Sequence, residues 1–227
     1  MNRAKSQRRF VFACLAPAVI LVALFMFWPT VNVFRMSLYR MGGITNRKEF
    51  IGLQNFKTLM EDKNFLEAMQ NTILIIVMVM IFTIVFAILF AAILQRGKFK
   101  GKNFFRVIFY IPNILSIVVI GGIFGAIYDP SNGLLNTFLE AVHLDFLTHK
   151  WMGEPKIVIY SIIFALVWQA IGYYMVMYMS GMSAIPEDLY EAASLDGSSE
   201  INTFFTVTLP LIWTNIRTTL TFYIIST

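Results

Sequence analysis

The chain has 227 residues, of which 58% are hydrophobic and 14% are charged. A soluble globular domain carries about 25% charged residues, so this composition excludes an ordinary soluble fold and predicts an all-α polytopic membrane protein. The net charge of +5 does not indicate nucleic-acid binding, because the basic residues lie in short clusters beside apolar runs. The single cysteine, Cys14, excludes an intrachain disulfide, and the sequence has no spacing typical of metal ligands.

The first apolar run covers residues 10–28 and follows a basic tail, residues 1–9. A cleaved signal peptide also starts with basic residues, but its apolar region is only about 7–15 residues long. Because this run is longer and leads into Trp28-Pro29, we interpret it as an uncleaved span that Pro29 ends. The basic tail is then expected in the cytoplasm.

The next two spans are separated by a strongly basic loop. Residues 29–71 are polar and mixed in charge, and we expect an extracellular loop with an interfacial helix. The run of residues 72–94 is long enough for a second span, since about 20 residues cross the hydrocarbon. Residues 95–106 hold five basic residues and no acidic one, which predicts a cytoplasmic loop. Residues 107–128 form a third run, in which we expect the small Gly121, Gly122 and Gly125 to let helices approach closely.

The second half of the chain repeats this alternation. Residues 129–156 begin with turn-forming residues and carry four acids, and we expect them outside the cell. Residues 157–180 form a fourth span. The loop of residues 181–210 therefore faces the cytoplasm, although it contains acidic residues and no Lys or Arg, because acids weigh little in the orientation rule. Residues 211–227 start a fifth span that is too short to cross, so we expect the chain to be incomplete at this end.

The cytoplasmic loop has the pattern of two short helices joined by a glycine turn. Pro186 suits the first turn of a helix, where a missing N–H costs nothing. Gly197 stands where that helix must stop, and Ser198 or Ser199 can cap the next one. We expect Pro210 to close the second helix.

A wider spacing in this loop carries a family resemblance. Glu191-Ala192-Ala193, then Gly197, then Val207-x-Leu209-Pro210 resembles the EAA loop of permease subunits of bacterial ABC importers. That pattern is EAA, three residues, Gly, nine residues and Ile-x-Leu-Pro, so the one departure is Val for Ile. The chain is most similar to the carbohydrate-uptake branch, with the permeases for maltose and glycerol phosphate. Residues 50–56 and 129–136 are similar to patterns of the same branch.

The resemblance implies a MetI-like helical bundle of about six spans in the bacterial inner, or plasma, membrane, with a cytoplasmic N-terminus. It implies that the loop docks on cytoplasmic ABC ATPase subunits. Because the loop is acidic, we expect an Arg or Lys of that partner to face Glu191. The other implied partners are a second permease subunit, which is a different chain in this branch, an extracellular solute-binding protein and a sugar. The implied ATPase-coupling residues are Glu191, Ala192, Ala193, Asp196, Gly197, Leu209 and Pro210.

The spans themselves show no chemistry of an enzyme. The four long runs contain no Asp, Glu, Lys or Arg, and the chain has no ATP site, so we expect no catalytic residue, no metal and no cofactor. The same absence argues against an ion-coupled carrier, since such carriers keep ionisable groups or broken helices near the midplane. A secondary carrier or channel without an ATPase partner, and a membrane scaffold or enzyme, remain the alternative functions.

Four polar residues of the apolar runs are candidates for a sugar path. Gln169 and Tyr173 lie one helical turn apart, Tyr174 is next to them, and Asn113 follows a proline in the third run. Aromatic faces and amide groups suit uncharged sugars, by stacking and by hydrogen bonds to hydroxyls. The same residues also fit an interfacial aromatic belt with ordinary helix packing, and the sequence leaves both interpretations open.

Overall fold

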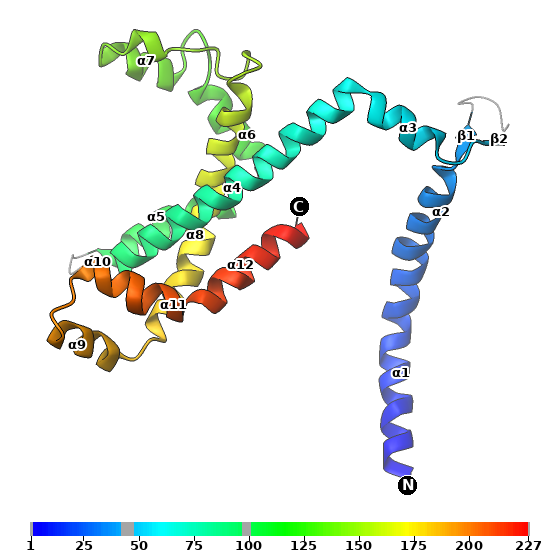
Figure 1. The fold of residues 1–227 in the computed structure, drawn as a ribbon, viewed down its shortest axis with the longest axis horizontal. Helices are drawn as coiled ribbons and strands as arrows, with labels where there is room; N and C mark the ends of the chain where they lie inside the picture. The colour runs from blue at the N-terminus through cyan, green and yellow to red at the C-terminus, as the bar shows by residue number, and fades with distance from the viewer. Residues whose placement is uncertain (1, 42–47, 97–100, 227) are drawn as a thin grey trace. The chain divides into compact units, whose positions relative to one another are not determined.

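A computed structural model describes residues 2–41, 48–96 and 101–226 (Figure 1). The chain divides into two compact units, Met1–Met69 and Gln70–Thr227. Three described helices are long and apolar enough to cross a membrane, Gln7–Met36, Lys63–Gln95 and Val158–Ser183, and a bent pair of helices makes a fourth if it counts as one span. The all-α fold expected from the composition is confirmed, with one small hairpin added.

The first unit begins with an uninterrupted helical run of α1 (Asn2–Val22), the π-helical η1 (Ala23–Phe27) and α2 (Trp28–Met36). The prediction that Pro29 ends this helix is wrong. A proline has no N–H and its ring collides with the carbonyl four residues earlier, which is Phe25 here. The Trp28 N–H bonds to the Ala23 carbonyl five residues back, and this wider turn accommodates the ring within the helix.

A hairpin and a short helix complete the first unit. The hairpin pairs β1 (Tyr39–Met41) with β2 (Lys48–Phe50), and the rings of Tyr39 and Phe50 lie 5.3 Å apart across it. Helix α3 (Gln54–Glu61) follows. The Asn55 side-chain amide donates to the Ser37 carbonyl at 2.7 Å and to the Tyr39 carbonyl at 3.2 Å, so it fastens α3 to the hairpin. Residues 50–56 therefore have a local structural role.

The second unit contains most of α4 and all later elements. Its helices are α4 (Lys63–Arg96), α5 (Lys102–Ile114), α6 (Ile117–Ile127), α7 (Leu134–Ala141), the 3-10 helix η2 (Asp145–Leu147) and α8 (Val158–Ser183). Five more follow: α9 (Glu187–Leu195), α10 (Glu200–Thr203), the π-helical η3 (Phe204–Thr208), α11 (Leu209–Leu211) and α12 (Trp213–Ser226). Helices α7 and α9 lie at opposite ends of this unit, and α8 runs between these ends (Figure 1).

The third apolar run, residues 107–128, is not one straight helix as expected. Helices α5 and α6 meet there at 103°. Leu115 is extended, and the Ser116 hydroxyl accepts the N–H of Val119 at 3.4 Å, so a new helix starts in the middle of the run. Apolar composition does not reveal this break, because the serine that caps α6 stands among hydrophobic residues.

The turn after α6 is built around Asp129. Its carboxylate accepts the N–H groups of Asn132 at 2.8 Å and Ser131 at 2.9 Å, and these two bonds lower the pKa of Asp129. A Cβ at Gly133 would overlap the Asp129 carbonyl oxygen, so the turn requires glycine there. The turn-forming pattern of residues 129–136 therefore starts α7.

A buried amide holds α7 against the following loop. The Asn136 side chain is 8% exposed, accepts the Trp151 indole N–H at 2.7 Å and donates to the His149 carbonyl at 3.1 Å. The Ser161 hydroxyl donates to the Trp151 carbonyl at 3.0 Å, which links this loop to α8. The end of the unit that carries α7 is therefore ordered by polar contacts as well as by packing.

Helices α4, α8 and the last helical run share the main core of the second unit. Its buried members are Ala87, Ile88, Ala91, Leu94, Met175, Tyr178, Met179, Met182, Ile212 and Ile216. Helix α5 also packs against α8, and the backbones touch at Gly172, where a Cβ would overlap the Phe109 carbonyl. A methyl group at Gly121, Gly122 or Gly125 would meet no described atom within 4 Å, so the close approach predicted at these glycines lies at Gly172 instead.

We expect Gly172→Val to lower the melting temperature of the detergent-purified chain by about 4–8 °C, because a side chain there must push two backbones apart at a cost of about 2 kcal/mol. Gly122→Val is the matched control, since it adds the same side chain to a helix position with open space. Equal melting temperatures for the two variants would contradict the packing of α5 on α8.

Candidate functional site

The segment from Pro186 to Pro210 begins with α9, which carries Glu187 and Asp188 in its first turn at the positive end of the helix dipole. Pro186 is the N-cap residue, one position before the helix. Gly197 has φ +73°, and the Ser198 N–H donates to the Ala193 carbonyl at 3.0 Å, which closes the end of α9. The predicted glycine turn is therefore confirmed.

The second helix of the segment starts at Glu200. Of the two candidate caps, Ser199 has this role, because its hydroxyl accepts the Asn202 N–H at 3.3 Å. The neighbouring Ser198 hydroxyl accepts from the Asn202 amide at 2.9 Å and contacts the Thr203 hydroxyl at 3.0 Å. These bonds fix the turn to the first residues of α10.

The prediction that Pro210 closes this second helix is wrong. The Leu209 N–H donates to the Phe204 carbonyl five residues back, so η3 widens the helix just before the proline, as η1 does before Pro29. Helical structure continues through α11 into α12, with one irregular residue at Ile212. The helix that begins at Glu200 and the last apolar helix are therefore one helical run.

A shallow groove of about 470 Å³ opens between α9 and the start of this run. It is lined by Leu189, Ala192, Ala193, Asp196, Gly197, Ser198, Asn202, Thr206 and Val207. Four of the predicted coupling residues thus come together in the groove. Glu191 is exposed beside it, whereas Leu209 packs against the main core and Pro210 is exposed outside the groove.

Large apolar side chains of the same segment are exposed in the described part of the chain. Leu195 is 88% exposed, Ile201 is 73% exposed and Phe205 is 59% exposed. The same segment carries five exposed acidic residues, Glu187, Asp188, Glu191, Asp196 and Glu200. A segment that exposes large apolar side chains together with charges of one sign is typical of a surface that binds another protein.

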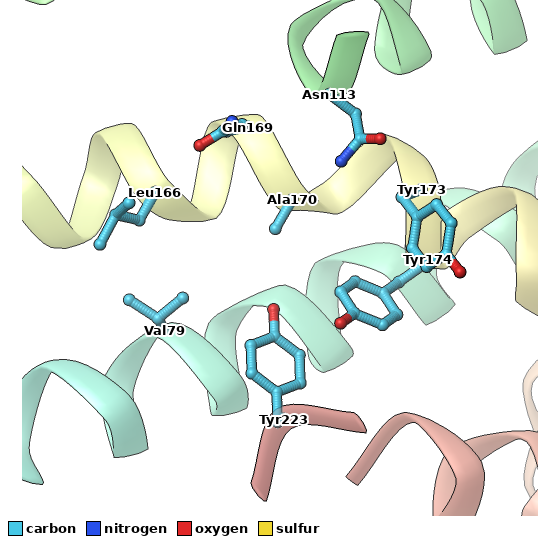
Figure 2. A pocket seen from close by; sticks show the side chains of 8 residues that line it. All are labelled: Val79, Asn113, Leu166, Gln169, Ala170, Tyr173, Tyr174 and Tyr223. Carbon is cyan, nitrogen blue, oxygen red and sulfur yellow. The ribbon is translucent and has the colours of Figure 1, made fainter. Parts of the chain in front are cut away.

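A pocket of about 430 Å³ lies within the second unit (Figure 2). Its lining residues are Val79 of α4, Asn113 of α5, Leu166, Gln169, Ala170, Tyr173 and Tyr174 of α8, and Tyr223 of α12. All four residues proposed for the sugar path therefore line one pocket. Sequence reasoning missed Tyr223, because no local pattern in the last run connects it with α8.

Three of the residues that line this pocket are tyrosines. The Tyr174 ring stacks on Tyr223 with centroids 5.0 Å apart, and it meets Tyr173 edge-on at 5.1 Å. The hydroxyls of Tyr174 and Tyr223 point into the same space, and Asn113 reaches toward α8 from the end of α5 (Figure 2). The eight lining residues offer amides, phenols and apolar groups, and none of them is charged. Such a pocket can bind a neutral ligand with many hydroxyls.

The sequence matches the family described as binding-protein-dependent transport system inner membrane component over residues 84–227. It is 36% identical over 197 residues to the probable ABC transporter permease protein YurN of Bacillus subtilis, covering 86% of this chain and 67% of that protein. It is 28% identical over 218 residues to the diacetylchitobiose uptake system permease protein NgcF of Streptomyces coelicolor, covering 92% of this chain and 62% of that protein. The chain spans about two thirds of the length of these relatives.

The fold has a counterpart among solved structures. A chain of a bacterial ABC transporter involved in the import of the acidic polysaccharide alginate superimposes with a TM-score of 0.83 at 25% identity. The similarity covers 96% of this chain and 73% of that one.

Proposed function

Because the chain belongs to the family of binding-protein-dependent transport system inner membrane components, we propose that it is the permease subunit of an ABC importer for carbohydrate. The observation that carries this proposal is the surface of residues 186–210, which lies inside the family match and exposes acidic and apolar groups together. Relatives named for diacetylchitobiose, multiple sugars and lactose support a carbohydrate as the substrate. ATP hydrolysis then belongs to a separate subunit.

In this proposal the surface of residues 186–210, called the docking surface from here on, binds the ATPase. Two ATPase subunits close on ATP, and each carries with it the α9 segment of one permease subunit. Glu191 binds a basic group of the ATPase, which fixes the register of docking. Ala192 and Ala193 leave the groove open to a partner side chain, and Gly197 sets the turn between the two helices.

We propose a membrane topology in which the two ends of the second unit face opposite sides of the membrane. The end with α9 is proposed to face the cytoplasm, together with residues 1–9 and the basic residues 95–106. The end with α7 is proposed to face outward, where an extracellular solute-binding protein delivers the sugar. The placement of α7 and α9 at opposite ends of the unit supports this assignment (Figure 1).

The pocket beside Gln169 is proposed to bind the sugar on its way through the membrane. Tyr173, Tyr174 and Tyr223 offer aromatic faces and hydroxyls, and Asn113 and Gln169 offer amides that donate and accept hydrogen bonds. Because none of the lining residues is a cation, the pocket favours an uncharged sugar over an acidic one. The second permease subunit of the importer completes the path.

Reconstitution tests the proposed function directly. The chain is placed in lipid nanodiscs with its ATPase and permease partners, and ATP hydrolysis is measured with empty and with sugar-loaded binding protein. We expect the loaded form to stimulate hydrolysis several-fold more than the empty form. Uptake into vesicles that lack the ATPase would instead support a secondary carrier or channel.

A further inference from the structure

The side chain of Tyr190 connects α9 with the helical run that begins at Glu200. Its hydroxyl lies 3.2 Å from the Thr208 hydroxyl, within hydrogen-bond distance. Thr208 is 1% exposed, so the contact is formed on the inner side of α9. The next residue along the chain, Glu191, is exposed. Tyr190 therefore faces the body of the protein, whereas Glu191 in the same helical turn is exposed.

Backbone hydrogen bonds connect Thr208 to the start of α12. It is the last residue of η3, and its carbonyl accepts the Ile212 N–H at 3.1 Å. The Ile212 carbonyl in turn accepts the N–H groups of Asn215 at 2.9 Å and Ile216 at 3.1 Å. Ile212 is the irregular residue between α11 and α12. Its side chain is fully buried in the main core, which holds this point of the helical run in place. A displacement of Thr208 is therefore passed on to α12.

The other end of α12 forms part of the pocket wall. Tyr223 follows Thr208 by fifteen residues, or about 22 Å of helix at 1.5 Å per residue. Its ring stacks on Tyr174 and lines the pocket with it (Figure 2). Because α12 carries Tyr223, a movement of α12 displaces the Tyr223 ring relative to Tyr174, the ring on which it stacks.

We propose that Tyr190 is a positioning residue that transmits the movement of α9 through Thr208 and α12 to Tyr223, and so couples the docking surface to the pocket. This proposal rests on the proposed function of an ATP-driven importer. Docking itself uses the exposed face of α9, so loss of the Tyr190 hydroxyl leaves the ATPase attached and weakens the transmission. Such coupling requires one structural element whose position depends on both the docking surface and the pocket. The helical run from Glu200 to Ser226 is that element.

The test uses the assembled transporter in nanodiscs with four variants: Tyr190→Phe, Thr208→Val, their combination and Thr208→Ser. Phe keeps the ring of Tyr190 and removes only the hydroxyl, while Ser keeps the hydroxyl of Thr208 and removes a methyl group. Tyr160→Phe is the matched control, because the Tyr160 side chain on α8 is 55% exposed. Four quantities are measured: the amount of co-purified ATPase, basal hydrolysis, and the maximal rate and half-saturation for sugar-loaded binding protein.

We expect Tyr190→Phe and Thr208→Val each to reduce the stimulated maximal rate about fivefold, as for the loss of one hydrogen bond, with basal hydrolysis, co-purification and half-saturation unchanged. The double variant is expected to fall no further than either single variant, because both remove the same contact. Thr208→Ser and Tyr160→Phe are expected to behave as the unaltered protein.

Three outcomes would overturn the inference: full stimulation in Tyr190→Phe, additive losses in the double variant, or loss of the ATPase from Tyr190→Phe, which would make Tyr190 part of the docking surface. These are distinct from a failure of the proposed function, in which the unaltered transporter itself shows no stimulation by loaded binding protein.

Discussion

Glu191→Lys is expected to lower sugar uptake by at least about tenfold, because it reverses an exposed charge in the acidic surface of residues 186–210 that is proposed to dock on the ATPase. The five exposed acids of this surface stand in a loop, residues 181–210, that contains no Lys or Arg. A complementary partner is basic, and placing like charges against each other across an interface costs several kcal/mol. Co-purification of the ATPase subunits and uptake of labelled sugar measure the effect.

The expected loss is one of attachment and not of folding. Glu191 is exposed, so Glu191→Lys leaves membrane insertion and the melting temperature unchanged. Glu191→Gln removes the charge without reversing it, and we expect an intermediate loss. The matched control is Glu67→Lys, the same reversal at an exposed position of α4. Normal uptake and normal ATPase recovery in Glu191→Lys would rule out this role for Glu191.

Tyr174→Ala is expected to reduce sugar uptake by at least about tenfold while stimulation of ATP hydrolysis by the loaded binding protein persists. The substitution removes a ring that faces the pocket and stacks on Tyr223, and an aromatic contact contributes about 0.5–1.5 kcal/mol beyond the area it buries. In the proposed function the binding protein docks at the end of the unit that carries α7, so we expect its signal to be retained and transport to become uncoupled from hydrolysis.

Tyr174→Phe separates the two contributions of this side chain. It keeps the stacked ring and removes the hydroxyl, so we expect a smaller loss of uptake than in Tyr174→Ala. Tyr160→Ala is the control, since it removes a tyrosine ring from an exposed position of the same helix. Uptake in Tyr174→Ala equal to that of the control would show that the sugar takes another path.

The long helices and the turn within residues 186–210 are predictable because the sequence patterns that mark them are local. Apolar length marks α4 and α8, and a glycine followed by a capping serine marks the turn at Gly197. The break at Ser116 is not predictable in this way, because hydropathy measures the burial of a run and not the direction of its axis. The prediction that a proline ends a helix is wrong at Pro29 and Pro210, because a wider helical turn before each proline accommodates its ring.

The pocket residues also divide into those predictable from local sequence spacing and those that depend on how the helices pack. Gln169 and Tyr173 share a helix face, so their proximity follows from sequence spacing. Asn113 and Tyr223 reach the pocket from α5 and α12, and their positions depend on how these helices pack on α8. Trp168, next to Gln169 in sequence, packs on Phe124 with ring centroids 5.4 Å apart and is not one of the pocket residues.

The wide turn at η3 has a consequence for the phase of the helix that follows it. A turn that closes five residues back takes in one residue more than an α-helical turn, and each α-helical residue advances the direction of side chains by about 100°. A helical wheel drawn without interruption from Glu200 to Ser226 is therefore out of phase beyond Thr208. Because η3 already takes in this extra residue, deleting one residue within it leaves the side chains of α12 in phase with α10. Deleting one residue of α12 before Tyr223 would instead rotate the Tyr223 ring by about 100° away from Tyr174.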